Sequence, residues 1–86
     1  MWYVVLTAVN PKPEYIAQTG YPYTRSDVLY CGGSEIKAKR IYEQTQDELE
    51  TKGGEYVYDH NMEFMNDYDV VFKKDYLYYT LQLYKK

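Results

Sequence analysis

Hydrophobic and polar positions alternate most regularly at the end of the chain, in residues 76–84. One set of alternating positions consists of Leu77, Tyr79, Leu81 and Leu83, and the other consists of Tyr76, Tyr78, Thr80, Gln82 and Tyr84. A period of two residues places the two sets on opposite sides of an extended strand. The pattern therefore predicts a β-strand with a leucine side in the core and a tyrosine side that faces away from it.

The start of the chain has no such alternation. Residues 2–9 are apolar on both sides of an extended strand and rich in β-branched and aromatic residues, which is typical of a central strand covered on at least one side. Shorter runs of similar character predict further strands at residues 27–31, 55–59 and 68–73. Residues 10–26 hold all three prolines and show no sustained period, which predicts a long loop or a loosely paired hairpin.

The helix signal is strongest between Ser34 and the pair Gly53-Gly54. Serine is a preferred N-cap residue, and two consecutive glycines are a typical helix stop. Between them, the members of one mostly apolar stripe recur at spacings of three and four and comprise Ala38, Ile41, Tyr42, Thr45 and Leu49. This spacing predicts an amphipathic helix that packs one stripe against a sheet.

The order of the predicted elements is ββαβββ or close to it, which indicates the α+β class. A chain of 86 residues has room for one hydrophobic core, and neither a repeat nor a linker divides this one. We expect a small single domain over residues 1–86. Its antiparallel sheet should have four to five strands, with one helix packed on one face.

Tyrosine is the unusual feature of the composition. The chain has 13 Tyr against 2 Phe and 1 Trp, which is more phenol than one small core needs. Tyr76, Tyr78 and Tyr84, joined by Tyr56 and Tyr58, are candidates for an exposed recognition surface, because tyrosine combines an apolar body with a polar tip. The alternative is that cross-strand tyrosine pairs only stabilise a half-exposed sheet.

A second group of candidate binding residues falls in the segment before the second strand. Tyr15, Tyr21, Tyr23 and Arg25 are of the residue types that dominate binding energy at interfaces, and nearby prolines limit the entropy of the segment. Long loops of this kind are often functional. The alternative is that these tyrosines cover an edge of the sheet.

Charge is unevenly distributed along the chain, whose net charge is −3. Residues 1–42 carry +2, residues 43–69 carry −8 and residues 70–86 carry +3. Blocks of one sign steer oppositely charged partners. The acidic block, with Asp47, Glu48 and Glu50, therefore predicts a face for a basic protein surface such as a nucleic-acid-binding groove. The alternative is a solvated helix face.

Residues suited to catalysis are few. His60 is the only histidine and lies in a predicted turn, and neither Ser26 nor Ser34 has a nucleophile-elbow sequence around it. We expect Cys31, the only cysteine, to be buried in its strand. One Cys and one His supply neither a disulfide nor a structural zinc site. These observations favour a protein that is not an enzyme and has no cofactor or metal.

The sequence also lacks a recognisable targeting signal. The apolar residues 2–9 are short for a signal peptide, follow no Lys or Arg, and lead into Asn10-Pro11 rather than a cleavage site. No apolar run approaches the roughly 20 residues needed to cross a bilayer. We expect a cytoplasmic protein, in the producing or infected cell, that makes no membrane contact.

These features favour a small, acidic, tyrosine-rich interaction protein that binds and inhibits a protein partner with a basic surface. Accessory proteins of bacteriophages and mobile elements that block host or defence machinery are similar in type, although no motif carries the analogy. One alternative is a small-ligand or nucleotide-binding protein that uses the Gly32-Gly33-Ser34 turn and tyrosine stacking. A third is a single-stranded nucleic-acid binder, which the overall acidity opposes, so that direct nucleic-acid binding is not expected.

Overall fold

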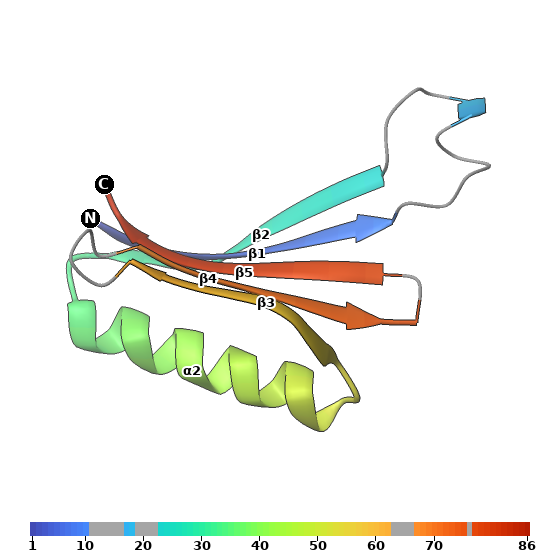
Figure 1. Cartoon of the computed structure of the whole chain (residues 1–86). Coiled ribbons are helices and arrows are strands. Elements are labelled where there is room, and N and C mark those ends of the chain that lie inside the picture. The colour runs from blue at the N-terminus through green and yellow to red at the C-terminus, as the bar shows by residue number, and fades with distance from the viewer. Residues whose placement is uncertain (11–16, 19–22, 63–66, 76) are drawn as a thin grey trace.

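The helix α2 (Glu35–Thr51) lies across one face of a five-stranded antiparallel sheet (Figure 1). The computed structural model describes residues 1–10, 17–18, 23–62, 67–75 and 77–86, with the backbone alone at Tyr23, at 58–62 and at Asp67. The strands are β1 (Trp2–Asn10), β2 (Tyr23–Gly32), β3 (Glu55–Met62), β4 (Asp67–Lys74) and β5 (Leu77–Lys85). The order ββαβββ and the α+β class are confirmed.

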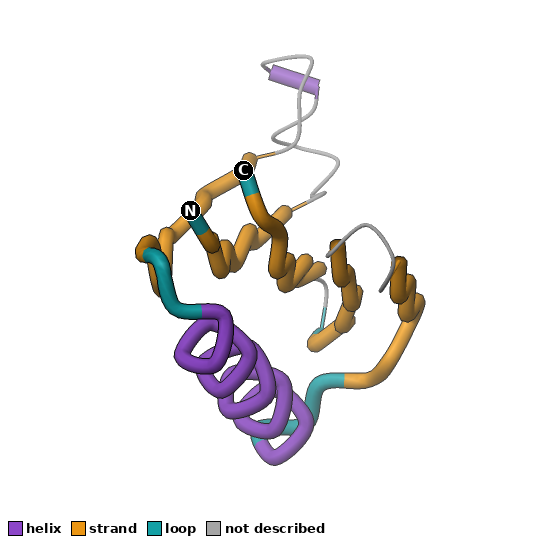
Figure 2. Tube along the Cα trace, turned by 90° about the vertical axis from the view of Figure 1, so that its left-hand side faces the viewer, coloured by secondary structure: helices purple, strands orange, loops and turns teal. Residues whose placement is uncertain are grey.

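The first and last strands of the chain are neighbours in the sheet, whose order is β2-β1-β5-β4-β3. The Met1 amino group donates a hydrogen bond to the Lys86 carbonyl oxygen at 3.0 Å, and the Lys86 amide donates to the Met1 carbonyl oxygen at 2.8 Å. Strands β2 and β3 form the two edges. Figure 2, which looks along the helix, shows α2 connecting these edges on one side of the sheet.

Helix α2 begins and ends where the sequence predicts. The Lys37 amide donates to the Ser34 hydroxyl at 3.2 Å, which is the bond expected of an N-cap serine. At the other end Gly53 adopts a left-handed φ of 90°, and the Gly54 amide donates to the Leu49 carbonyl oxygen at 2.8 Å. A Cβ at Gly54 would lie 2.7 Å from that oxygen, so both glycines are required by the helix end.

The core lies between α2 and the middle of the sheet. Its buried residues are Trp2, Val4, Ala38, Tyr42, Val70, Phe72, Leu81 and Leu83. Ile41 and Leu49, from the predicted helix stripe, pack against this cluster. The leucine side of β5 therefore faces α2, as its alternation predicts. Every fully buried residue of the described strands lies on that same face of the sheet.

Strand β2 begins earlier than the sequence predicts, at Tyr23 instead of Asp27. Its first residues are polar and give no strand pattern, but their backbones pair with the end of β1 in an antiparallel ladder. The hydroxyls of Thr7 and Ser26 are 2.9 Å apart across this ladder. Residues 23–26, which the sequence assigns to the loop before the second strand, are therefore part of β2 and pair with β1. The two paired strands extend past the end of the helix in Figure 1.

Candidate functional site

The face of the sheet that points away from α2 is the candidate site. Side chains alternate along each strand, and the pairing register shows which residues share this side. We call it the open face; its described residues are Tyr3, Val5, Thr7, Val9, Thr24, Ser26, Val28, Cys31, Glu55, Asp69, Val71, Lys73, Tyr78, Thr80, Gln82 and Tyr84. No element of the described chain covers it (Figure 1 and Figure 2).

A stacked tyrosine pair lies on the open face. Tyr3 of β1 is paired with Tyr84 of β5, and their ring centroids are 5.3 Å apart with an interplanar angle of 16°. Both residues are half-buried. Stacked rings held by two interior strands form a rigid apolar platform at one end of the face.

Tyr78 lies on the open face near the opposite end of β5. The Lys73 ammonium nitrogen is 5.8 Å from the centroid of its ring, within the range of a cation–π contact. Between Tyr78 and the stacked pair, β5 presents Thr80 and Gln82. The tyrosine side predicted for this strand is therefore present at Tyr78 and Tyr84, while Tyr76 lies outside the described residues.

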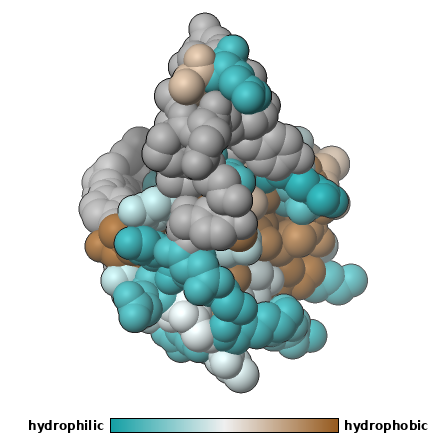
Figure 3. Space-filling view, turned by 90° about the vertical axis from the view of Figure 1, so that its right-hand side faces the viewer, coloured by the Kyte–Doolittle hydropathy of each residue, from teal (hydrophilic) through white to brown (hydrophobic). Residues whose placement is uncertain are grey.

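The β2 flank of the open face carries its most exposed apolar side chains. Val28 is 63% exposed, and Leu29, which lies at an irregularity in the pairing with β1, is 37% exposed. In Figure 3 hydrophobic atoms gather on the flank of the molecule where β2 lies. Because β2 is an edge strand, this flank offers apolar side chains beside a free backbone edge within the described chain.

Cys31 corrects an expectation from the sequence. It is exposed instead of buried, because β2 is an edge strand and the register places Cys31 on the open face opposite Tyr3. A hydrogen bond with the Cys31 side chain, together with the charge of its thiolate, raises the pKa of Tyr3 above its ordinary value. The thiol thus sits beside a tyrosine platform and not in the core.

Tyr56 also departs from its expected place. Its ring lies on the α2 side of the sheet, with its centroid 4.5 Å from that of Phe72, and its hydroxyl accepts a hydrogen bond from the Gln46 side chain. The register shifts between Tyr56 and Tyr58, and this irregularity breaks the alternation that would put the two on one side. The side chain of Tyr58 falls outside the described residues.

The acidic residues expected at a binding face lie on the helix, away from the tyrosines. Asp47, Glu48 and Glu50 are all exposed, and Glu48 also lines a cavity between α2 and the sheet. Because α2 covers the face opposite the tyrosines, the acidic surface and the open face point in opposite directions (Figure 2). A single small partner surface therefore contacts one of them and not both.

The segment before β2 contributes little that the structure describes. Arg25 is exposed and its Nε atom lies 3.6 Å from a carboxylate oxygen of Asp27, in a solvent-facing ion pair. Tyr15 and Tyr21 lie outside the described residues, and only the backbone is described at Tyr23, where it pairs with Asn10. The binding role predicted for these tyrosines stays a prediction.

The Gly32-Gly33-Ser34 turn joins β2 to α2, and the amide and hydroxyl of Ser34 form hydrogen bonds within the chain. The Ser34 amide donates to the Tyr30 hydroxyl at 3.2 Å, and the Ser34 hydroxyl caps the helix. A Cβ at Gly32 would lie 2.5 Å from the Tyr30 hydroxyl oxygen, so this glycine makes room for the tyrosine. Glu35, the first helix residue, pairs with Lys39 at 2.9 Å.

Tyr3 and Val28 lie on the open face but were not among the binding residues that the sequence predicts. Tyr3 is hidden because residues 2–9 are apolar at every position, so the pattern does not show which side is covered. The alternation of Trp2 and Val4 with Tyr3 and Val5 was the available signal, since tryptophan is rarely placed on a solvated face.

Comparison of the chain with protein-family models, with curated proteins and with solved structures gave no significant match. Within the described residues, no helix is long and apolar enough to cross a membrane. The same residues contain no group of three or more His, Cys, Asp or Glu side chains placed to hold a metal ion.

Proposed function

We propose that this protein is a non-catalytic binding protein that captures a protein partner on its open face and inhibits that partner by covering it. One observation carries the proposal: a sheet face left uncovered by the described chain presents Tyr3, Tyr78 and Tyr84 together with the exposed Val28. Tyrosine and valine supply contact area with few rotatable bonds. A centre poor in charge is typical of the buried part of an interface.

The size of the open face suits a protein partner. Five strands spaced at about 4.8 Å, with about eight residues each at about 3.3 Å, give a face of about 600 Å². One partner in an interface of standard size contributes about 800 Å². The β2 edge, where Leu29 is exposed, lies next to this face and can supply further contact.

Inhibition by occupancy is the mode that fits a domain whose described side chains do not bring a nucleophile and a general base together. The exposed Cys31 thiol lies beside Tyr3, which is not a general base for it at neutral pH. A small domain of this kind acts by occupying a surface that its partner needs. An accessory protein of a bacteriophage or mobile element, acting in the cytoplasm of the infected cell, is the biological setting that we propose.

The exposed side of α2 is the second candidate for contact. Glu43, Asp47 and Glu50 follow one another at helical spacing and are all exposed. Such a row can imitate a phosphate backbone and occupy a nucleic-acid-binding groove. With a net charge of −3, the same charges can instead steer a basic partner that then docks on the open face.

A protein ligand fits the open face better than a single-stranded nucleic acid does. Nucleic-acid binding needs cations for the phosphates beside rings for the bases. Among the described open-face residues Lys73 is the cation, and its ammonium group lies over the ring of Tyr78. The nearby carboxylates of Glu55 and Asp69 share this face with Lys73 and would repel a phosphate chain.

A photo-crosslinking experiment tests the proposal. The photoreactive amino acid p-benzoylphenylalanine replaces Thr80 at the centre of the open face or, as the matched control, Glu43 on the exposed side of α2. Irradiation of cells that produce each variant should give a protein adduct from position 80 and none from position 43. Adducts from position 43 alone would transfer the site to the helix. Adducts from neither position would contradict the proposal.

A further inference from the structure

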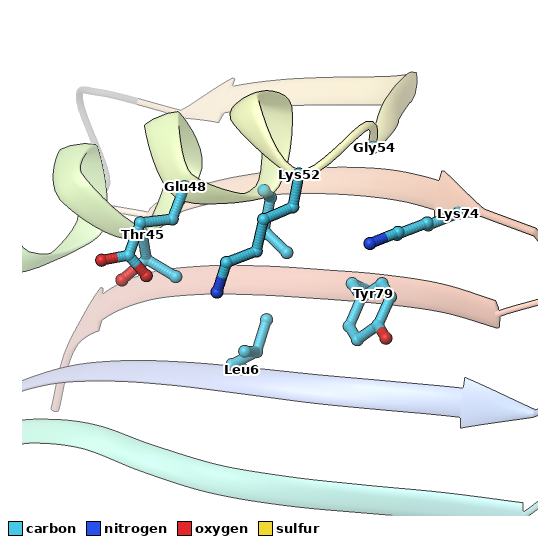
Figure 4. A pocket seen from close by; sticks show the side chains of 8 residues that line it. Leu6, Thr45, Glu48, Lys52, Gly54, Lys74 and Tyr79 are labelled. Carbon is cyan, nitrogen blue, oxygen red and sulfur yellow. The ribbon is translucent and has the colours of Figure 1, made fainter.

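A cavity of about 230 Å³ lies between the C-terminal half of α2 and the sheet, on the side away from the open face (Figure 4). Leu6, Leu49 and Tyr79 form its apolar floor and walls. All three pack against the edge of the core without being fully buried. Gly54, which follows the end of the helix, also lines the cavity.

Two lysines converge on this cavity from different elements. Lys52 is the C-cap residue of α2 and Lys74 ends β4, and in Figure 4 their side chains extend toward the space above Leu6 and Tyr79. Among the described residues neither ammonium group forms an ion pair. Glu48 and Thr45 lie together at the other side of the rim (Figure 4). With two lysines and one glutamate, the lining of the cavity thus carries one net positive charge.

We propose that this cavity binds a small monoanion with an apolar body, of the class of aromatic or branched short-chain carboxylates. The apolar floor takes the hydrocarbon part, and the carboxylate lies between the Lys52 and Lys74 ammonium groups in charge-assisted hydrogen bonds. A cavity of about 150 Å³ holds one benzene molecule, so the volume here suits roughly nine or ten non-hydrogen atoms.

The charges and the volume select this class of ligand over others. A nucleotide is too large for the cavity, and its several negative charges would meet the Glu48 carboxylate at the rim. A neutral apolar molecule would make no charge-assisted hydrogen bond to the two ammonium groups. The site lies near the helix end opposite the Gly32-Gly33-Ser34 turn, and it is independent of partner docking because the open face is on the other side of the sheet.

Titration with phenylacetate, followed by amide chemical shifts in NMR spectra, tests the site. We expect a dissociation constant of about 1 mM or lower for a ligand of this size. The largest shifts should occur at the amides of Leu6, Leu49, Gly54 and Tyr79. The neutral analogue phenylacetamide should bind about tenfold more weakly. Shifts at other amides only, or none at about 10 mM phenylacetate, would overturn the proposal.

Charge variants make the test specific. Lys52→Met and Lys74→Met keep the apolar stem and should each weaken phenylacetate binding about three- to tenfold, whereas Lys37→Met, on the same helix but away from the cavity, should not. Glu48→Gln should strengthen binding about two- to threefold by removing repulsion. Unchanged affinity in both cavity lysine variants, or weaker binding in Glu48→Gln, would contradict a site for a simple anion.

Discussion

The two faces of the sheet use the same five strands but carry different side chains. On the face against α2, Val4, Val70, Phe72, Leu81 and Leu83 are each at most 1% exposed. On the open face every described residue is half-buried or exposed. Apolar character alone does not separate the faces, because valines occur on both. Tyrosine also occurs on both, so the difference lies in leucine, phenylalanine and tryptophan on the α2 face and threonine on the open face.

Under the proposed function, this difference separates the residues that stabilise the fold from those that contact a partner, within one layer of strands. Side chains on the α2 face lose nearly all contact with water, so their removal leaves a cavity and costs both transfer and packing energy. Side chains on the open face keep much of their contact with water, so they contribute less to folding and remain available to a partner. Paired substitutions on the two faces can therefore measure each role separately.

The largest contrast in stability should come from two residues of β5 that lie on opposite faces of the sheet. Leu83→Ala removes a fully buried side chain and should lower the free energy of unfolding by about 2–5 kcal/mol. Thr80→Ala, on the same strand but on the open face, should lower it by less than about 1 kcal/mol. Urea unfolding followed by circular dichroism measures both values. Equal losses in the two variants would mean that the open face is covered after all.

A contrast within one residue type removes the effect of side-chain chemistry. Tyr42 on α2 is 9% exposed and lies in the core, so Tyr42→Ala should cost about 3 kcal/mol. Tyr84→Ala loses a stacked neighbour on the open face and should cost about 1 kcal/mol or less. Thermal unfolding of the two variants measures both losses of stability. A Tyr84→Ala variant as unstable as Tyr42→Ala would assign that tyrosine to packing instead of recognition.

The glycines at the two ends of α2 should differ in how much stability is lost when each is replaced by alanine. A Cβ at Gly54 would approach the Leu49 carbonyl oxygen to 2.7 Å and the Phe72 ring to 3.4 Å, so Gly54→Ala should cost about 1–3 kcal/mol. A Cβ at Gly33 would meet nothing within 4 Å, so Gly33→Ala should change stability by less than about 0.5 kcal/mol. The denaturant concentration at the midpoint of unfolding, measured for both variants, gives the two changes in stability. Equal midpoints would contradict the packing described at the helix end.

The smallest expected effect concerns the open face and pH. The Cys31 contact raises the pKa of Tyr3, so Cys31→Ala should lower that pKa toward its ordinary value of about 10. Because the folded chain holds the Tyr3 proton more tightly than the unfolded chain does, the contact stabilises the fold below about pH 10 and loses this effect above it. NMR titration of ¹³C-labelled tyrosines measures the shift. No change in Cys31→Ala would contradict the contact.

Local signals in the sequence were sufficient for the helix and for the last strand. Ser34 and Gly53-Gly54 mark the helix ends through hydrogen bonds to nearby residues, and the alternation in β5 assigns Leu81 and Leu83 to the core. Both signals depend on neighbours along the chain. The alternation in β5 also predicts that Tyr78 and Tyr84 lie on the face of the sheet away from the helix.

Features that depend on distant parts of the chain could not be predicted in this way. The pairing of β1 with β5 rests on backbone hydrogen bonds that any two strands can make, so the sequence does not specify the strand order. The register irregularity next to Tyr56 moved that residue to the α2 side. The cavity between Lys52 and Lys74 is lined by residues of β1, α2, β4 and β5, which only the folded chain brings together.

Reactivity of the single cysteine tests the central claim most directly, because Cys31 reports on the open face without any substitution. Its thiol is exposed, so iodoacetamide should alkylate it readily in the folded protein. Binding of the partner captured by crosslinking should slow this alkylation about tenfold or more, because a docked protein excludes the reagent from the face. An alkylation rate that stays the same when the partner is bound would contradict docking on the open face.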